Sequence, residues 1–310
     1  MSIIRNVTSL ALVALAASVV ACSGSAADDS AVANQNLNDG DCDANGTWAI
    51  KIETPVQWAN SFVVQGGTGT ITNWLKSTRT ANGTEITDVA SLCGVSVPDY
   101  SSQAAFGGEK YGIQFPDALF ESGTLPTVEI AGHLTGLAPG SSFASDPAAA
   151  ILGATMTSPA TDPWPANGAQ LSAQDTDNDA KVGVSVDTNK SAGYKNPPLD
   201  AFLSARAQRV YTAFRQVLST QGTISTCNRV DGSGTIAVIN NKPAIDQHVL
   251  GCQRENGTDC SASEYKLLDS AAPVYKPSGD AVVTMVRIPA EATCADIRAI
   301  DFATATGDLP

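Results

Sequence analysis

Three aspartates at alternate positions have the clearest ligand-like spacing in the chain. Asp175, Asp177 and Asp179 occupy positions one, three and five of a short loop, and position seven is Lys181. Carboxylates spaced in this way can converge on a calcium ion, with the backbone carbonyl of Lys181 as a further ligand. A solvated acidic loop between two strands explains the same residues without a metal. If calcium binds, we expect a weak dissociation constant on the order of 10⁻⁴–10⁻³ M, as in extracellular modules.

The acidic loop resembles the calcium loops of EF-hand, dockerin and thrombospondin type 3 repeats, and it departs from them at two positions. Position six is Ala180 where those loops use glycine, and a left-handed alanine costs about 1–2 kcal/mol. Position twelve is Val186 in place of glutamate, with Asp187 one residue later. The resemblance implies calcium as a cofactor, with one more ligand supplied from elsewhere.

No short catalytic motif accompanies these aspartates. The sequence contains neither a G-x-S-x-G elbow nor an H-E-x-x-H zinc motif. Glu129 with His133, and Asp246 with His248, are same-face pairs that could act as acid and base, although exposed strand faces commonly produce such pairs. A glycosidase needs two carboxyl groups about 5–10 Å apart, and the spacing does not select a pair among the acidic residues of one stretch: Glu109, Asp117, Glu121 and Glu129.

The first 22 residues carry the signal of an exported lipoprotein. Arg5 precedes an apolar run over 10–21, which is too short for a mature bilayer span and typical of a secretory signal peptide, 1–21. The run ends in Val19-Val20-Ala21-Cys22, which resembles the bacterial lipobox. The resemblance implies acylation of Cys22 and a lipid anchor in the membrane, and Ser23 after it implies the outer membrane. The alternative is an ordinary cleaved signal peptide with an incidental Cys22.

The other cysteines predict a disulfide framework in a single folded domain. Residues 22–41 are mostly small and polar, which predicts a flexible acidic tether before a domain over 42–310. An even number of cysteines in an exported chain predicts three disulfides, and they are Cys42, Cys93, Cys227, Cys252, Cys260 and Cys294. Cys252 and Cys260 flank an Asn-Gly turn, which predicts a local bridge between them. The spacing leaves the pairing of the other four open.

The composition limits the partners. The chain has 18 Lys and Arg residues against 31 Asp and Glu, and loss of the signal peptide leaves 17 against 31. Without a basic cluster, this charge argues against nucleic acid and anionic lipid as partners. Only two histidines are present, so a His-rich metal site is not expected. A hydrophobic fraction of 43% provides for a substantial core.

The pattern of apolar residues predicts a mainly β domain, antiparallel and barrel-like or a sandwich, with one or two short helices. Trp48, Ile50 and Ile52 alternate with Ala49, Lys51 and Glu53, as in a half-buried strand. The runs 68–80 and 84–97 flank Asn82-Gly83, a strong hairpin signal. Further strands are predicted over 127–135, 148–157, 181–187, 234–239, 264–268 and 281–288. The Pro-rich segments 159–165 and 196–198 are predicted loops, and Trp164 either presents its ring to a ligand or anchors its loop.

One segment gives conflicting signals. Leu203, Ala207, Val210 and Phe214 follow helical spacing, while the β-branched and aromatic composition of the same region favours a strand. We predict a helix over 200–215 and a strand from Val217 onward. A short terminal helix is predicted over 295–302.

A second resemblance bears on how the sheet closes. Gly46-Thr47-Trp48 at the start of the first strand is similar to the G-x-W that begins lipocalin barrels, and Arg287 in the last strand could cap that tryptophan. The resemblance implies a closed sheet, which also removes exposed strand edges. The lack of a short catalytic motif, the many turns and the three predicted bridges favour a non-enzymatic binding or structural role. A closed sheet further suggests a pocket or loop surface for a hydrophobic small molecule, a glycan or another envelope protein. The alternative is an envelope hydrolase with paired carboxylates on the same scaffold.

Overall fold

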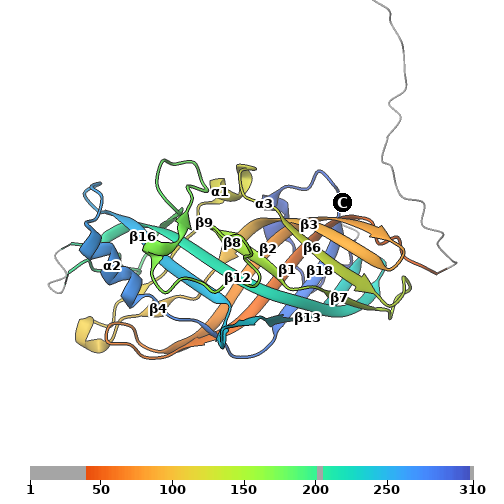
Figure 1. Cartoon of the computed structure of the whole chain (residues 1–310), viewed down its shortest axis with the longest axis horizontal. Coiled ribbons are helices and arrows are strands. Elements are labelled where there is room, and N and C mark those ends of the chain that lie inside the picture. Colours follow the sequence, from red (N-terminus) through yellow and green to blue (C-terminus); the bar gives the residue numbers. More distant parts are fainter. Residues whose placement is uncertain (1–39, 201–204, 308–310) are drawn as a thin grey trace, which may run out of the picture. The chain divides into compact units, whose positions relative to one another are not determined.

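The computed structural model describes residues 40–200 and 205–307 (Figure 1), all of which belong to one compact unit. The predicted signal peptide, Cys22 and all of the tether except Gly40 and Asp41 lie outside the described residues. No helix in the described ranges combines the length and the apolar character needed to cross a bilayer.

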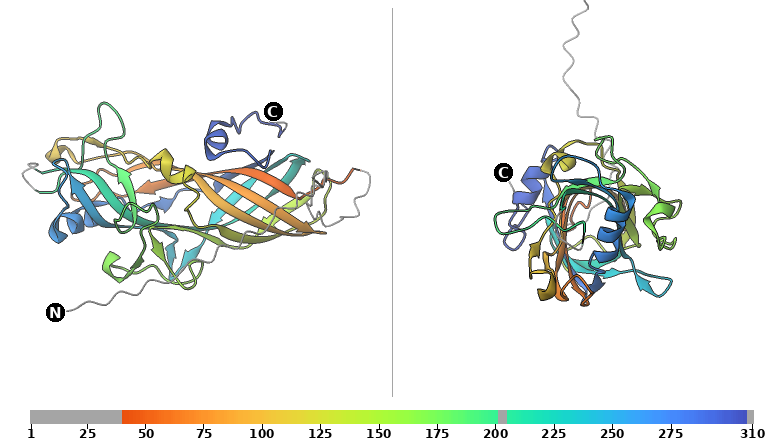
Figure 2. Two further views of the ribbon diagram at one scale, coloured as in Figure 1. Left: turned by 90° about the horizontal axis from the view of Figure 1, so that it is seen from above. Right: turned by 90° about the vertical axis from the view of Figure 1, so that its left-hand side faces the viewer.

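Eight antiparallel strands close into a hydrogen-bonded ring in which each strand pairs with the next ring strand along the chain, and the last pairs with the first. Seen end-on, the strands surround a common centre (Figure 2, right). This confirms the predicted mainly β, barrel-like fold. The ring consists of β1 (Gly46–Trp58), β2 (Gly67–Asn82), β3 (Glu85–Ser96), β6 (Val128–Leu134), β7 (Ser142–Ser145), β12 (Ala207–Thr226), β13 (Arg229–Ile236) and β18 (Ala281–Ile288).

The longest strand, β12, extends beyond the ring and gains further partners there. Along one edge it pairs with β7, β8 (Ala148–Leu152) and β11 (Val184–Asp187), and along the other with β13 and β16 (Ile245–Arg254). The remaining short strands are β4 (Tyr100–Ser101), β5 (Lys110–Tyr111), β9 (Ala154–Thr155), β10 (Ser172–Ala173), β14 (Val238–Ile239), β15 (Lys242–Pro243) and β17 (Lys276–Pro277).

The predicted helix over 200–215 is wrong, because β12 starts at Ala207; residues 201–204 lie outside the described ranges. From Val210 to Leu218 nearly every residue is buried, so both faces of the strand are covered. A strand covered on both faces shows a continuous apolar run without period-two alternation. Its β-branched residues were therefore the better guide, and the strand predicted from Val217 onward is confirmed.

The described residues form three α-helices, α1 (Asp117–Glu121), α2 (Ala262–Ala271) and α3 (Cys294–Ala299), besides two short 3₁₀ turns. The strand predicted over 264–268 is wrong, since it lies within α2. The Glu264 carboxylate accepts a hydrogen bond from the backbone N–H of Ser261 at 2.7 Å and ion-pairs with Arg254. This is the S-x-x-E capping signal of a helix N-terminus. The α3 helix confirms the short terminal helix.

The hairpin between β2 and β3 is confirmed with its turn one residue later than the Asn-Gly signal suggested. Asn82 still pairs with Glu85, so Gly83 and Thr84 form the two-residue loop. Gly83 has a φ of 63°, and a glycine at the first loop position fits a type II′ turn.

Apolar layers lie on both sides of the ring wall, and three disulfides are present among the described residues. Inside, Ile50, Ile52 and Met285 belong to the main core, whereas α3 covers Ala49 and Val286 on the outside. The predicted Cys252–Cys260 bridge is confirmed, and the two pairs left open by the sequence are Cys42–Cys227 and Cys93–Cys294. The last of these ties α3 to β3.

Charged side chains fill the end of the ring where β1 begins. The guanidinium groups of Arg79 and Arg287 lie 5.1 and 5.0 Å from the Trp48 ring centre. The contact expected between Arg287 and Trp48 is therefore present. Gly46 has a φ of 129°, which residues with a side chain rarely adopt, and a Cβ there would also approach Arg287 Nη1 to 2.6 Å. Arg79 also forms a buried ion pair with Asp88 at 2.8 Å.

Candidate functional site

An apolar cavity of about 210 Å³ lies at the other end of β1, where the chain turns toward β2. We call it the mouth cavity. Val63 and Val64 of the β1–β2 connection, Val210 of β12, Val249 of β16 and Leu268 of α2 contribute to its wall. The wall therefore combines residues from distant parts of the chain, which the sequence alone did not bring together.

Aromatic rings surround the mouth cavity. Phe62, Phe106, Tyr100, Tyr111 and Tyr275 all contribute to its wall. The Phe62 side chain is 85% exposed and meets Phe106 edge-to-face, with ring centres 5.2 Å apart. Burial and the neighbouring tyrosine raise the pKa of Tyr100 to about 12, and burial and the bond to Glu109 raise the pKa of Tyr111 to about 12. Both phenols are therefore uncharged at neutral pH.

The polar groups in this wall have partners within the protein. Gln247 donates to the Pro273 carbonyl at 2.7 Å, and the Thr212 hydroxyl donates to the His248 carbonyl at 3.0 Å. Asp200, which also lines the cavity, accepts a hydrogen bond from the backbone of Ala205. Among the described residues that line the cavity there is no lysine or arginine.

His248 lies in the cavity wall and pairs with Asp269 of α2. Its Nδ1 lies 3.0 Å from the Asp269 carboxylate, and its Nε2 lies 3.0 Å from the Pro165 carbonyl. Both ring nitrogens face acceptors, an arrangement that favours the doubly protonated imidazole. The hydrogen bond to Asp269 raises the pKa of His248 despite partial burial. The partner of His248 is therefore Asp269, not the same-strand Asp246 that the sequence suggested.

Asp246 is instead held by Arg215, which anchors the Pro-rich loop. The Arg215 side chain is 1% exposed and contacts Asp246 at 2.6 Å. It also donates to the carbonyls of Pro159 and Asp162. Trp164 lies under this guanidinium at 5.4 Å and stacks on His248 at 6.0 Å. Of the two roles left open for Trp164, the structure favours anchoring.

The four acidic residues considered for glycoside hydrolysis do not meet at the mouth cavity, because none of them lines it. Glu109 ion-pairs with Arg206 at 2.9 Å, and this contact lowers the pKa of its carboxyl. Asp117 and Glu121 both lie beside Arg298 on the outside of the ring. Glu129 is exposed on β6, as is His133.

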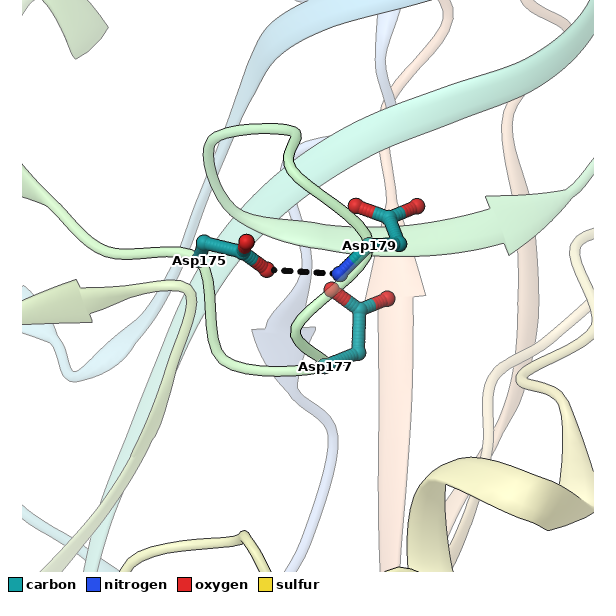
Figure 3. A group of neighbouring side chains, drawn as sticks. All are labelled: Asp175, Asp177 and Asp179. Atoms are coloured by element: carbon teal, nitrogen blue, oxygen red, sulfur yellow. Dashed lines mark hydrogen bonds between the residues drawn. The ribbon is translucent and has the colours of Figure 1, made fainter.

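The acidic loop brings its three carboxylates together, as its spacing predicted (Figure 3). Oxygens of Asp175, Asp177 and Asp179 lie within 4.8 Å of one another. Asp175 accepts the backbone N–H groups of Asp179 and Ala180, which folds the loop back on its first residue. Ala180 has a φ of 66°, so position six takes the left-handed conformation that EF-hand loops reserve for glycine.

Three features of this loop bear on metal binding. Asp177 Oδ1 is buried without a hydrogen-bond partner, and burial raises the pKa of its carboxyl. Asp177 Oδ2 accepts a hydrogen bond from the backbone N–H of Ser185, and Asp179 Oδ2 accepts one from the Ser185 hydroxyl. Lys181 directs its ammonium group to Asp259 at 2.9 Å. Calcium itself stays a prediction.

Comparison of the chain with protein-family models, with curated proteins and with solved structures found no match.

Proposed function

We propose that this chain is a non-enzymatic envelope lipoprotein that holds an uncharged apolar small molecule in the mouth cavity. The observation that carries the proposal is the cavity of about 210 Å³ with its mainly apolar and aromatic wall. An engineered apolar cavity of about 150 Å³ is already sufficient to bind benzene. Apolar pockets with a few convergent polar groups are the common form of small-molecule sites.

The charge of the wall supports a neutral ligand. A buried carboxylate or phosphate without a cationic partner is strongly disfavoured, and the described wall residues include no lysine or arginine. The one cationic group, His248, is already neutralised by Asp269. The wall therefore disfavours an anionic ligand. The one carboxylate among its described residues, Asp200, already accepts a hydrogen bond from Ala205, and the mainly apolar lining favours a ligand without formal charge.

The side chains that could perform hydrolysis have structural partners, which supports binding rather than catalysis. Glu109 is held by Arg206, Asp246 by Arg215 and His248 by Asp269. Each of these contacts joins separate segments of the chain. We therefore assign these groups to holding the cavity wall in place.

Binding of an uncharged naphthylamine dye, whose fluorescence rises in apolar surroundings, tests the proposal. The wild-type protein should show a saturable rise in fluorescence. Ala271→Trp on α2 fills part of the mouth cavity and should abolish most of it. Ala262→Trp provides the matched control, because Ala262 is exposed on the same helix and does not line the cavity. Equal dye binding by both variants would contradict the assignment of the site.

We propose further that Cys22 anchors the protein to the outer membrane. The support is the lipobox-like Val19-Val20-Ala21-Cys22 and the small polar residues that follow it. Fully extended, the residues between Cys22 and Cys42 would reach roughly 60 Å. Cys22→Ser should yield soluble protein or uncleaved precursor in cell fractionation. A mature-size variant that still sediments with membranes would show that another feature anchors it.

A further inference from the structure

Two smaller cavities continue the apolar space inside the ring beyond the mouth cavity. The first has about 40 Å³, is lined by Phe115, Phe214 and Ile245 together with the paired Arg215 and Asp246, and shares Val97 and Tyr275 with the mouth cavity. We call it the inner cavity. The second has about 50 Å³ and lies among Ile50, Leu75 and Met285, nearer the end of the ring where β1 begins. We call it the far cavity.

A single side chain, Gln216 of β12, borders both the inner and the far cavity. Its Oε1 accepts from Asn73 Nδ2 of β2 at 2.6 Å, and its Nε2 donates to Thr54 Oγ1 of β1 at 2.9 Å. In the ring order, β2 lies four strands from β12 in either direction. These hydrogen bonds therefore cross the interior from one wall to the opposite wall. We call the three side chains the crossbar.

The crossbar is buried and hydrogen-bonded. Thr54, Asn73 and Gln216 are each at most 5% exposed, and the two hydrogen bonds given above join their side chains. Breaking the hydrogen bonds of the crossbar would leave buried amide and hydroxyl groups without partners, which carries a large free-energy penalty. That penalty exceeds the gain from burying one more methylene, which is worth about a fourfold increase in affinity.

We propose that Gln216 sets the maximum length of the ligand, which is an uncharged amphiphile with a linear apolar tail. The inference rests on the proposed function of the mouth cavity. The bulkier part of the ligand occupies the mouth cavity, and the narrow inner cavity receives only the end of an unbranched chain. The tail stops at the crossbar, so the far cavity stays out of its reach.

A series of n-alkanols from hexanol to hexadecanol, displacing the naphthylamine dye, tests this proposal. With wild-type protein, affinity should rise about fourfold per methylene and then level off at one chain length. In Gln216→Ala the rise should continue to longer alkanols. Gln221→Ala is the matched control, because Gln221 is an exposed glutamine of the same strand, and its plateau should equal that of the wild type. An unchanged plateau in Gln216→Ala overturns the inference.

A second variant guards against misfolding. Asn73→Ala combined with Gln216→Ala removes both amides, so that no buried amide loses its partner, and it should also extend the series. If neither variant folds, the wild-type protein can be labelled with an alkanol that carries a photoreactive diazirine at its tail end. The labelled residues then show how far the tail reaches. Labelling at Phe115 or Phe214 supports the crossbar as the stop, whereas labelling at Leu75 or Met285 overturns it.

The two proposals fail in different ways. If the wild-type protein binds neither the dye nor any alkanol, the proposed function is wrong. If it binds them with affinity that rises through the whole series, the cavity binds ligands but Gln216 does not limit their length.

Discussion

Replacing Asp88 by asparagine should destabilise the protein far more than the same change in an exposed ion pair. The Arg79 and Asp88 side chains are 2% and 4% exposed. Arg79 donates to both carboxylate oxygens, at 3.0 and 2.8 Å. In Asp88→Asn the guanidinium keeps its charge and its burial but faces an amide. Removing one partner of a buried pair costs about 3–5 kcal/mol.

Local charge places the expected effect toward the upper end of that range. Arg287 lies over the same Trp48 ring as Arg79, and burial, together with the charge of Arg79, lowers the pKa of Arg287. Without Asp88, two like charges would share one buried region. For a domain of this size, about 3–5 kcal/mol corresponds to a fall in melting temperature of roughly 6–20 °C.

Asp187→Asn is the matched control. Asp187 and Arg209 are likewise cross-strand partners, on β11 and β12, but their side chains are 44% and 40% exposed. An exposed pair contributes about 0–1 kcal/mol. Guanidinium unfolding, monitored by tryptophan fluorescence, gives the free energy of unfolding of each variant.

A double variant separates charge burial from packing. Arg79→Met with Asp88→Leu removes both charges, and such replacements of buried pairs are often neutral or stabilising. The double variant should therefore be more stable than Asp88→Asn. If Asp88→Asn costs no more than Asp187→Asn, or if the double variant is as unstable as the single one, the reasoning is refuted.

Three other predictions concern the bridges, the acidic loop and the cavity wall. Replacing Cys93 and Cys294 together by alanine should lower the free energy of unfolding by about 2–5 kcal/mol, measured by denaturant titration, and a loss below 1 kcal/mol would show that α3 is held by packing alone. Calorimetric titration with millimolar calcium should release heat that Asp177→Ala abolishes, and heat of equal size in both proteins would exclude the loop. Because its pKa is raised in the folded state, His248 stabilises the fold fully below its unfolded pKa of about 6.5, and this stabilisation is lost as pH rises through the folded pKa. Asp269→Asn should therefore flatten the pH dependence of the unfolding midpoint above 6.5, and parallel curves for the two proteins would contradict the pairing.

Local signals in the sequence were sufficient for the strands that alternate. Strand β18 was predicted with the bounds that the structure shows, and β1 and the β2–β3 hairpin were predicted within a few residues. These strands have one face on the core and one face toward solvent or a thin outer layer. The Cys252–Cys260 bridge was also predictable, since a turn lies between its cysteines.

The two errors have distinct physical causes. Residues of β12 pair along both edges and are covered on both faces. Such a strand is apolar on both faces, so its sequence lacks the period-two alternation that identifies a half-buried strand. The α2 helix is only ten residues long, and its apolar residues are too few for a clear helical period. Its capping signal, Ser261 to Glu264, was present in the sequence and would have been the better evidence.

The mouth cavity and the crossbar were not predictable, because their residues meet only after the ring closes. Gln216 and Thr54 are 162 residues apart in sequence, and each is a polar residue at an inward position. In a binary pattern such a residue suggests an outward face. The hydrogen-bond partner that compensates the burial of each residue comes from another strand, so local sequence patterns cannot identify it.

The inward polar residues bear on why the ring closes in one register. Asp88 must face Arg79, and Gln216 must reach Asn73. A shift of one residue in any of these strands would turn the side chain outward and leave its partner buried without a hydrogen bond. Alkyl side chains in the same layers would tolerate several registers with little loss. We therefore infer that these polar contacts contribute specificity of closure more than net stability, in keeping with the near-neutral double variant expected at Arg79 and Asp88.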